Sequence, residues 1–266
     1  MPYRSFVFSM ISLVLSVVPC AAAGPFHAVP CEGAYPKHLQ GICTNDVDAI
    51  YWSFTTVLVK TDTEGRVLQK ADVADHHGDL CWHDGKVFVA VNLGLFNQPA
   101  GKSDSWVYVY DGDTLGKLAR HKVPELVHGA GGIAFHDGRF FVVGGLPPGV
   151  NENYVYQYDA SFAFQKRHVL ASGYTLMGIQ TVAFSGGCWW FGCYGVPRVL
   201  VKADRDFNVL GKWNIDGSLG IAPLPGGQFL IARGSSEKGK GYTGKLRPAT
   251  ADDDSGLRFL EEPQKE

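Results

Sequence analysis

The chain has no excess of basic charge. Its 266 residues include 24 lysines and arginines against 26 aspartates and glutamates, for a formal net charge of -2. A nucleic-acid groove usually carries a stripe of positive charge, whereas Lys238-Gly239-Lys240 is a short cluster typical of a solvated loop. The composition therefore argues against a nucleic-acid partner.

Long apolar runs are also scarce. One stands at the start, where an apolar run from Ser5 to Val18 follows Arg4 and an Ala-x-Ala site ends at Ala23. This pattern predicts a secretory signal peptide over residues 1–23, because its apolar core is short for a membrane span. A lipoprotein signal using Cys20 is the weaker alternative, since Pro19 stands where such signals have a small residue. We expect a secreted or periplasmic protein with no transmembrane segment after signal removal.

Cysteines are few, and the number after the predicted signal peptide is odd. After residue 23 they stand at positions 31, 43, 81, 188 and 193, so outside the cytoplasm at least one thiol is unpaired or intermolecular. Cys188 and Cys193 are expected on one strand, roughly 16 Å apart and too far to be bridged. Cys43 and Cys81 hold equivalent positions in two repeats, where small buried hydrophobes are usual. The spacing matches no zinc finger.

Helical periodicity is almost absent, and the apolar runs are short, aromatic or β-branched, and bounded by Gly, Asp and Pro. One strand recurs five times at intervals of 37 to 53 residues, the period of a propeller. Its copies are residues 50–54, 87–91, 140–144, 189–192 and 229–232. Each copy is preceded by an expected inner strand and followed by two outer strands.

The repeat predicts an all-β fold, a five-bladed β-propeller of four-stranded antiparallel blades. After signal removal, residues 24–266 form one domain with blades at approximately 38–75, 76–127, 128–176, 177–217 and 218–263. Residues 24–37 precede the first blade and are expected to close the ring against the last. The recurring aspartates 62, 111, 159 and 204 are expected to bond the backbone two residues on. His83 and His136 stand in hairpin corners and are expected to face solvent.

Polar residues open the inner strands, which should converge on one mouth of the central channel. We assign His77 and His128 as candidate bases with Asp79 as their partner, because a neutral imidazole is the usual general base near pH 7. The set His76, His77, Asp79 and His128 is a candidate site for a divalent metal, the one cofactor considered. The same residues could instead hydrogen-bond water in the channel.

Other residues of the same face are candidates for substrate binding. They are His38 and Gln40 in the first blade, Gln180 and Tyr194 in the fourth, and Arg233 in the fifth. The arginine could hold a carboxylate through two hydrogen bonds. The loops carrying Phe96 and Glu152 should build an asymmetric rim over the mouth.

The phrase His38-Leu39-Gln40-Gly41-Ile42 resembles the aromatic-x-Gln-Gly-Leu blade opening of the plant and bacterial type of glutaminyl cyclotransferase. The blade pattern and the count of five also resemble this family of secreted propellers. The family's acidic Glu-Gly-Trp-Gly-Leu motif has no counterpart, since residues 128–132 read His-Gly-Ala-Gly-Gly. The resemblance implies the five-bladed fold.

Three functions follow from these observations, because a fold does not determine a function. The first is a secreted enzyme, a lyase or hydrolase, acting on a small polar substrate such as a sugar derivative or peptide end. The alternative is a non-catalytic propeller that binds a glycan or a protein. The third is a scaffold whose polar mouth only holds water.

Overall fold

The computed structural model describes residues 28–260, so the signal peptide predicted over residues 1–23 lies outside the described part. Within residues 28–260 there are nineteen strands and one short 3-10 turn, η1 (Pro225–Gly227). No helix in this part of the chain is long and apolar enough to cross a membrane.

The strands pair antiparallel in chain order, in one sheet of seven strands and three sheets of four. The sheet of seven contains two groups of four that share one strand, so the strands form five groups of four. The first two groups comprise β1 (Gly41–Thr44), β2 (Ile50–Ser53), β3 (Thr55–Thr61), β4 (Val67–His83), β5 (Lys86–Asn92), β6 (Ser105–Asp111) and β7 (Lys117–Lys122). The third comprises β8 (Ala130–His136), β9 (Arg139–Gly144), β10 (Asn153–Tyr158) and β11 (Phe164–Leu170). The fourth comprises β12 (Leu176–Ser185), β13 (Cys188–Tyr194), β14 (Val199–Ala203) and β15 (Val209–Trp213). The fifth comprises β16 (Ile221–Leu224), β17 (Gln228–Glu237), β18 (Gly241–Asp252) and β19 (Gly256–Phe259).

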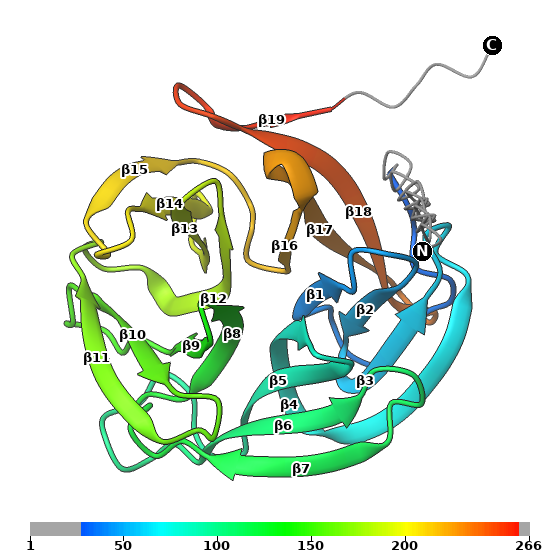
Figure 1. Ribbon diagram of the computed structural model, residues 1–266, viewed down its shortest axis with the longest axis horizontal. Coiled ribbons are helices and arrows are strands. Elements are labelled where there is room, and N and C mark those ends of the chain that lie inside the picture. Colours follow the sequence, from blue (N-terminus) through cyan, green and yellow to red (C-terminus); the bar gives the residue numbers. More distant parts are fainter. Residues whose placement is uncertain (1–27, 261–266) are drawn as a thin grey trace, which may run out of the picture.

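The sheets stand around a common axis (Figure 1). The inner strands contact one another in turn around this axis, and the last contacts the first. In order they are β1, the second half of β4, β8, β12 and β16. The buried apolar residues form five clusters, and each cluster joins two successive sheets around this ring. This arrangement confirms the predicted all-β fold of four-stranded antiparallel blades and is consistent with five of them.

Strand β4 belongs to two blades. The expected boundary between the first two blades, at residues 75 and 76, falls inside one continuous strand of 17 residues. Its first half pairs with β3 and its second half with β5, with register irregularities near His77. The outer strand of the first blade therefore runs directly into the inner strand of the second.

Inner strands approach very closely at the axis. A Cβ atom on Gly41 would lie 2.4 Å from the Cα of Asp79, and one on Gly78 would lie 2.3 Å from the carbonyl oxygen of Gly131. Real Cβ contacts are never so short, so glycine is required at both positions. The inner strands therefore pack directly against one another at the axis.

The N-terminal segment closes the ring. Tyr35 exchanges two backbone hydrogen bonds of 2.8 Å with Tyr242 of β18, and the Cys31 N–H donates to the Gly244 carbonyl at 2.9 Å. The Tyr35 ring stacks on Phe54 of the first blade at 4.0 Å between centroids, and its hydroxyl donates to the Glu32 carbonyl. This segment joins the last blade to the first, as expected of residues 24–37. The part before residue 28 lies outside the described residues.

The recurring turns confirm one prediction and correct another. Each of the four aspartates accepts a hydrogen bond from the backbone N–H two residues on, at 2.9 to 3.1 Å. His83 and His136, however, do not simply face solvent. They stack on Phe135 and Phe184 of the next blade at 3.5 and 3.6 Å, so the corner histidines help to join neighbouring blades.

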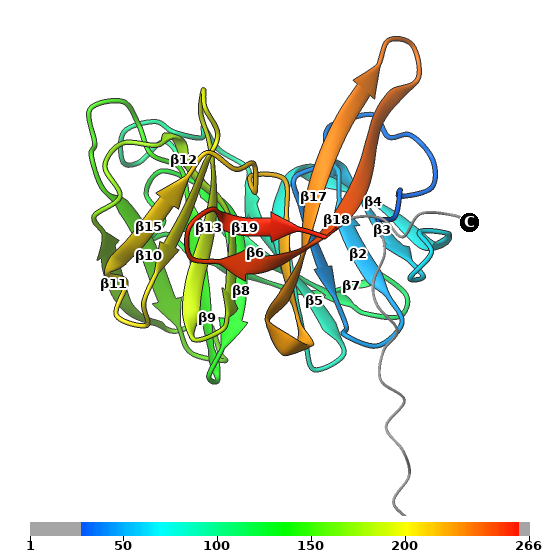
Figure 2. The same ribbon diagram turned by 90° about the horizontal axis from the view of Figure 1, so that it is seen from above.

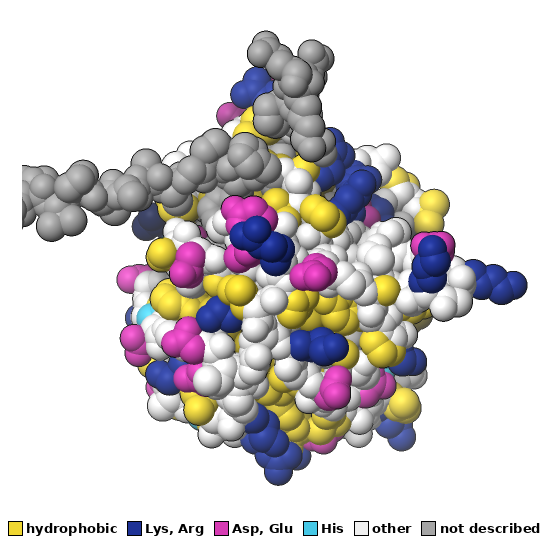
Figure 3. Space-filling view, turned by 90° about the vertical axis from the view of Figure 1, so that its right-hand side faces the viewer, with side chains coloured by type: hydrophobic (Ala, Val, Ile, Leu, Met, Phe, Trp, Pro, Cys, Tyr) yellow, Lys and Arg dark blue, Asp and Glu magenta, His cyan; other side chains and the backbone are white. Residues whose placement is uncertain are grey.

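Charges are mixed over the side of the molecule that carries the first blade. Figure 3 shows Lys and Arg side chains interspersed with Asp and Glu and separated by apolar areas. This view shows no broad field of one sign, in keeping with the small net charge.

We expect Tyr35→Ala to destabilise the protein by about 3–5 kcal/mol, because it removes a buried ring and leaves a cavity at the closure. Tyr35→Phe should cost only about 1 kcal/mol, the net contribution of one hydrogen bond. Urea unfolding of both variants measures the effect, with Tyr174→Ala as control because Tyr174 is 43% exposed. A Tyr35→Ala protein as stable as wild type would show that this closure does not stabilise the ring.

Candidate functional site

A cavity of about 150 Å³ opens where the inner strands begin, and we call it the mouth cavity. Its polar lining consists of His38, Gln40, His76, Asn92, Gln180 and Tyr194. All of these except Asn92 are among the residues predicted from the sequence to form a site. The structure therefore brings five predicted residues from three blades together.

The apolar wall of the mouth cavity comes from Phe96, Ala130 and Met177. The Phe96 ring packs against Gly129, where a Cβ atom would lie only 2.4 Å from the ring. Asn92 holds the loop that carries Phe96, donating to the Gly94 carbonyl at 2.9 Å and accepting from the Asp104 N–H at 3.1 Å. Sequence reasoning missed Asn92 and Met177. The available signal for Asn92 was a polar residue directly after the apolar run of residues 87–91.

The polar groups of the mouth cavity are held in place by their neighbours. The Gln180 amide donates to the Met177 carbonyl at 2.6 Å. The Arg198 guanidinium lies 5.0 Å from the centre of the Tyr194 ring and donates to Ser218 Oγ at 2.7 Å. Burial raises the pKa of Tyr194, so its hydroxyl stays protonated and can donate or accept a hydrogen bond.

The two histidines of the mouth cavity come from neighbouring blades. Partial burial lowers the pKa of His38, and the nearby His76 and Lys37 lower it further while Asp75 raises it. His38 is therefore neutral near pH 7 and can accept a proton. His76 is exposed, and its Nδ1 lies 3.9 Å from a carboxylate oxygen of Asp75.

His77 does not reach the mouth cavity. It is fully buried, with Nδ1 2.6 Å from the Ala74 carbonyl oxygen and Nε2 2.7 Å from the Tyr110 hydroxyl oxygen. Since a carbonyl only accepts, Nδ1–H is the donor and Nε2 accepts from Tyr110. Burial lowers the pKa of His77 to about 4. Both nitrogens are occupied within the protein, so this arrangement offers neither a base nor a metal ligand to the channel.

His128 and Arg233 also lie away from the mouth cavity. His128 Nδ1 donates to the Gln98 carbonyl at 2.8 Å, and the residue lines a separate hollow with Tyr154 and Tyr156. Arg233 lies on an exposed part of β17, over the Phe259 ring at 5.8 Å. The structure thus places these two predicted site residues elsewhere on the surface.

Asp79 lies beneath the mouth cavity and is 1% exposed. Its Oδ2 accepts from the Val182 N–H of the fourth blade at 3.2 Å, while Oδ1 has no hydrogen-bond partner among residues 28–260. Burial raises the pKa of Asp79 well above its ordinary value, although the N–H groups of Leu80, Val182 and Ile42 act in the opposite direction. Burial therefore favours the neutral form of this carboxyl, which links blades across the axis.

The predicted metal set is not assembled. His77 and His128 use their Nδ1 atoms on backbone carbonyls, and within residues 28–260 no three His, Cys, Asp or Glu side chains are grouped so that they could hold a metal ion. The lining of the mouth cavity suits hydrogen bonding and proton transfer by imidazole.

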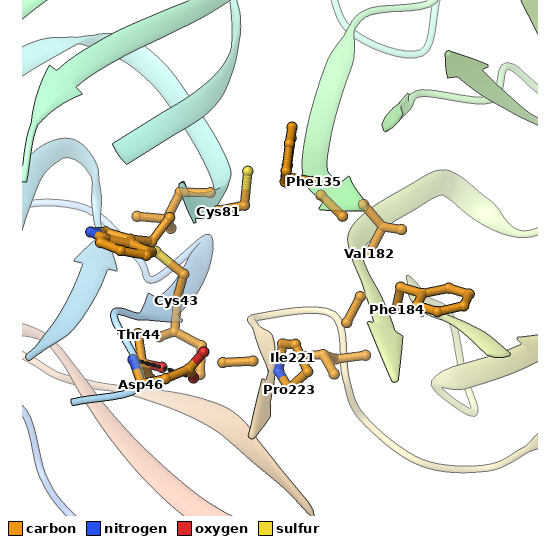
Figure 4. A pocket seen from close by; sticks show the side chains of 15 residues that line it. Cys43, Thr44, Asp46, Cys81, Phe135, Val182, Phe184, Ile221 and Pro223 are labelled. Atoms are coloured by element: carbon orange, nitrogen blue, oxygen red, sulfur yellow. Dashed lines mark hydrogen bonds between the residues drawn. The ribbon is translucent and has the colours of Figure 1, made fainter. Parts of the chain in front are cut away.

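A second cavity of about 170 Å³ opens at the other end of the channel, on the face of the hairpin corners. Figure 4 shows Cys43 and Cys81 on one side of it, Phe135 next to Cys81, and Val182 and Phe184 on the opposite side. Burial raises the pKa values of both thiols, so they stay protonated. The backbone beside Asp79, at Ile42, Leu80 and Val182, lines this second cavity, while Gly78 lines the mouth cavity. Asp79 therefore lies between the two cavities.

The sequence matches no family model and no curated protein. Among solved structures, the glutaminyl cyclase of Myxococcus xanthus is 12% identical, with a TM-score of 0.56 over 89% of this chain and 100% of its own. The chain is a β-propeller. The Dos1 propeller is 12% identical with a TM-score of 0.44 over 87% of this chain and 74% of its own. The computationally designed Ika4 protein is 14% identical with a TM-score of 0.39 over 70% and 95%. At 12% identity the similarity of this propeller to the glutaminyl cyclase shows its fold alone.

We expect His77 to make the propeller's stability depend on pH. Its pKa falls from 6.5 to about 4 on folding, so below pH 6.5 the unfolded chain binds more protons and stability is lost as the pH falls toward 4. The loss should reach roughly 3 kcal/mol. It should be absent from His77→Gln and retained by His76→Gln, an exposed neighbour, when both are unfolded in urea at several pH values. Equal acid dependence of wild type and His77→Gln would contradict the assignment.

Proposed function

We propose that the protein binds a small polar ligand, a sugar derivative or a peptide end, in the mouth cavity. One observation carries this proposal: side chains from separate blades converge there as hydrogen-bonding groups beside an aromatic wall. Ligand sites commonly combine apolar walls with a few placed polar groups.

The lining narrows the class of ligand. Amide, imidazole and phenol groups dominate it, and within residues 28–260 no carboxylate and no Lys or Arg side chain belongs to it. These groups favour a ligand rich in hydroxyl or amide groups over one bearing a strong charge. The cavity is smaller than the roughly 300–1,000 Å³ of sites for drug-sized molecules, so it suits one ring or one terminus of a longer chain.

Catalysis at the same cavity is the second candidate. His38 supports it, because its lowered pKa keeps the imidazole in the form that accepts a proton. The lyase or hydrolase chemistry expected from the sequence would then use His38 and His76 in place of His77, Asp79 and His128. A peptide with N-terminal glutamine is one substrate to test, since the similar structure from Myxococcus xanthus is a glutaminyl cyclase.

We expect Gln40→Ala and Gln180→Ala each to weaken ligand binding about tenfold, the effect of losing one hydrogen bond. Ligands are first found by thermal shift with neutral oligosaccharides and short peptides, and affinities are then measured by calorimetry. His128→Ala is the control, because His128 lies outside the cavity. Equal affinity of wild type and both glutamine variants for every ligand found would overturn the proposal.

His38→Ala separates recognition from catalysis. In an enzyme it should abolish turnover while the ligand still binds, whereas a recognition protein shows no turnover in either form. Retained turnover in His38→Ala would exclude His38 as the base.

We also propose that the protein is exported, with residues 1–23 as its signal. The mature protein recovered from the periplasm or medium should begin at Gly24, and intact mass measures this directly. Recovery of the chain in the cytoplasm with Met1 still present would contradict export.

A further inference from the structure

Strands β17 and β18 form an arm that extends beyond the disc of blades (Figure 2). Their pairing runs from Gln228 with Thr250 to Glu237 with Gly241. On its other side, β17 pairs with β16 only as far as Ile231. The outer half of the arm is therefore exposed, and Arg233 lies at its base.

Three cations share one face of this arm. Arg233 is paired with Lys245, and Arg247 is paired with Ile231. Directly paired residues point to the same side of a sheet, as do residues two apart on one strand. Arg233, Lys245 and Arg247 are thus neighbours, about 5 Å apart across the strands and about 7 Å apart along them.

An aromatic ring and a groove accompany these cations. The guanidinium groups of Arg247 and Arg233 lie 4.3 and 5.8 Å from the centre of the Phe259 ring. Together with Ala28, Val29 and Pro30, the three cations line an open groove of about 600 Å³. Contacts with an aromatic ring favour defined positions for the guanidinium groups.

No described carboxylate neutralises the three cations. Elsewhere, cations pair with acids, as in Lys202 with Asp253 at 2.9 Å and Lys240 with Glu237 at 2.6 Å. Within residues 28–260, no Asp or Glu oxygen lies within 4.0 Å of the side-chain nitrogens of Arg233, Lys245 or Arg247. Among the residues that the structure describes, the positive charge of the groove is therefore uncompensated, on a protein with a net charge of -2.

We propose that this groove binds an acidic polysaccharide through its carboxylates. A row of separated cations fits repeated charges along a chain better than it fits one small ion. The next pair on the same face is Ser235 and Thr243, whose hydroxyl oxygens lie 2.8 Å apart. A row of cations followed by hydroxyls matches a uronic acid chain, which alternates carboxylates with hydroxyl groups. The groove is separate from the mouth cavity, so this proposal does not depend on the proposed function.

The test uses a galacturonic acid hexamer as the probe and the full mature protein, with affinity measured by calorimetry. Arg233→Gln combined with Lys245→Gln should weaken binding at least about tenfold, and Arg247→Gln alone about tenfold, because charge-assisted hydrogen bonds are lost. The matched control is Lys117→Gln with Arg120→Gln on β7, two exposed cations that also lie over aromatic rings. This control should bind as wild type does.

The outcomes are distinguishable. Equal weakening in the control would show binding through general charge and overturn the site. Binding of a neutral glucose hexamer with the same affinity would overturn the role of the carboxylates, and tighter binding of poly-glutamate than of the uronic acid hexamer would identify an acidic peptide as the partner instead.

If Arg247→Gln unfolds, the variant with Arg233→Gln and Lys245→Gln still decides the question, because neither of these side chains is buried. Gln40→Ala should leave binding of the hexamer unchanged, which separates this site from the mouth cavity.

Discussion

The burial of each sheet against the next one is the interaction on which the rest of the structure depends. Five apolar clusters each join two successive sheets, so each blade has two apolar faces and neither face is covered by the blade's own strands. Stability therefore requires the ring to close. The cluster at the closure includes Cys31 and Tyr35 from the N-terminal segment, so a stretch outside the repeat completes the last junction.

Closure also shapes the candidate site. Five inner strands must meet at the axis, and at Gly41 and Gly78 they leave no room for a side chain. Asp79 occupies this constriction and accepts a hydrogen bond from across the axis. The mouth cavity above it and the second cavity below it therefore have different chemistry. The first is lined by amides and imidazoles, and the second by thiols and aromatic rings.

The fold could be predicted because turn residues and short apolar runs recur at a regular interval. Both are determined by residues that are close together in the sequence. The orientation of single side chains was harder to predict. Residues alternate between the two faces of a strand, so His76 and Gly78 line the mouth cavity while His77 points into the junction between blades. Arg233 was placed at the mouth because its strand was expected to end there, whereas β17 continues to Glu237. Long-range placements of this kind depend on register and strand length, which a repeat pattern does not encode.

Strand β4 has a mechanical consequence. Other blades are joined by loops, such as residues 123–129 and 171–175, in which the chain can be cut or extended without breaking a sheet. Between the first two blades there is no such loop, because one strand belongs to both. These two blades should move as one rigid unit. A displacement of the strand at its outer end, near Val67, is then transmitted through the backbone of β4 to Gly78 at the channel. Circular permutation should accordingly be tolerated at the other junctions and not at this one.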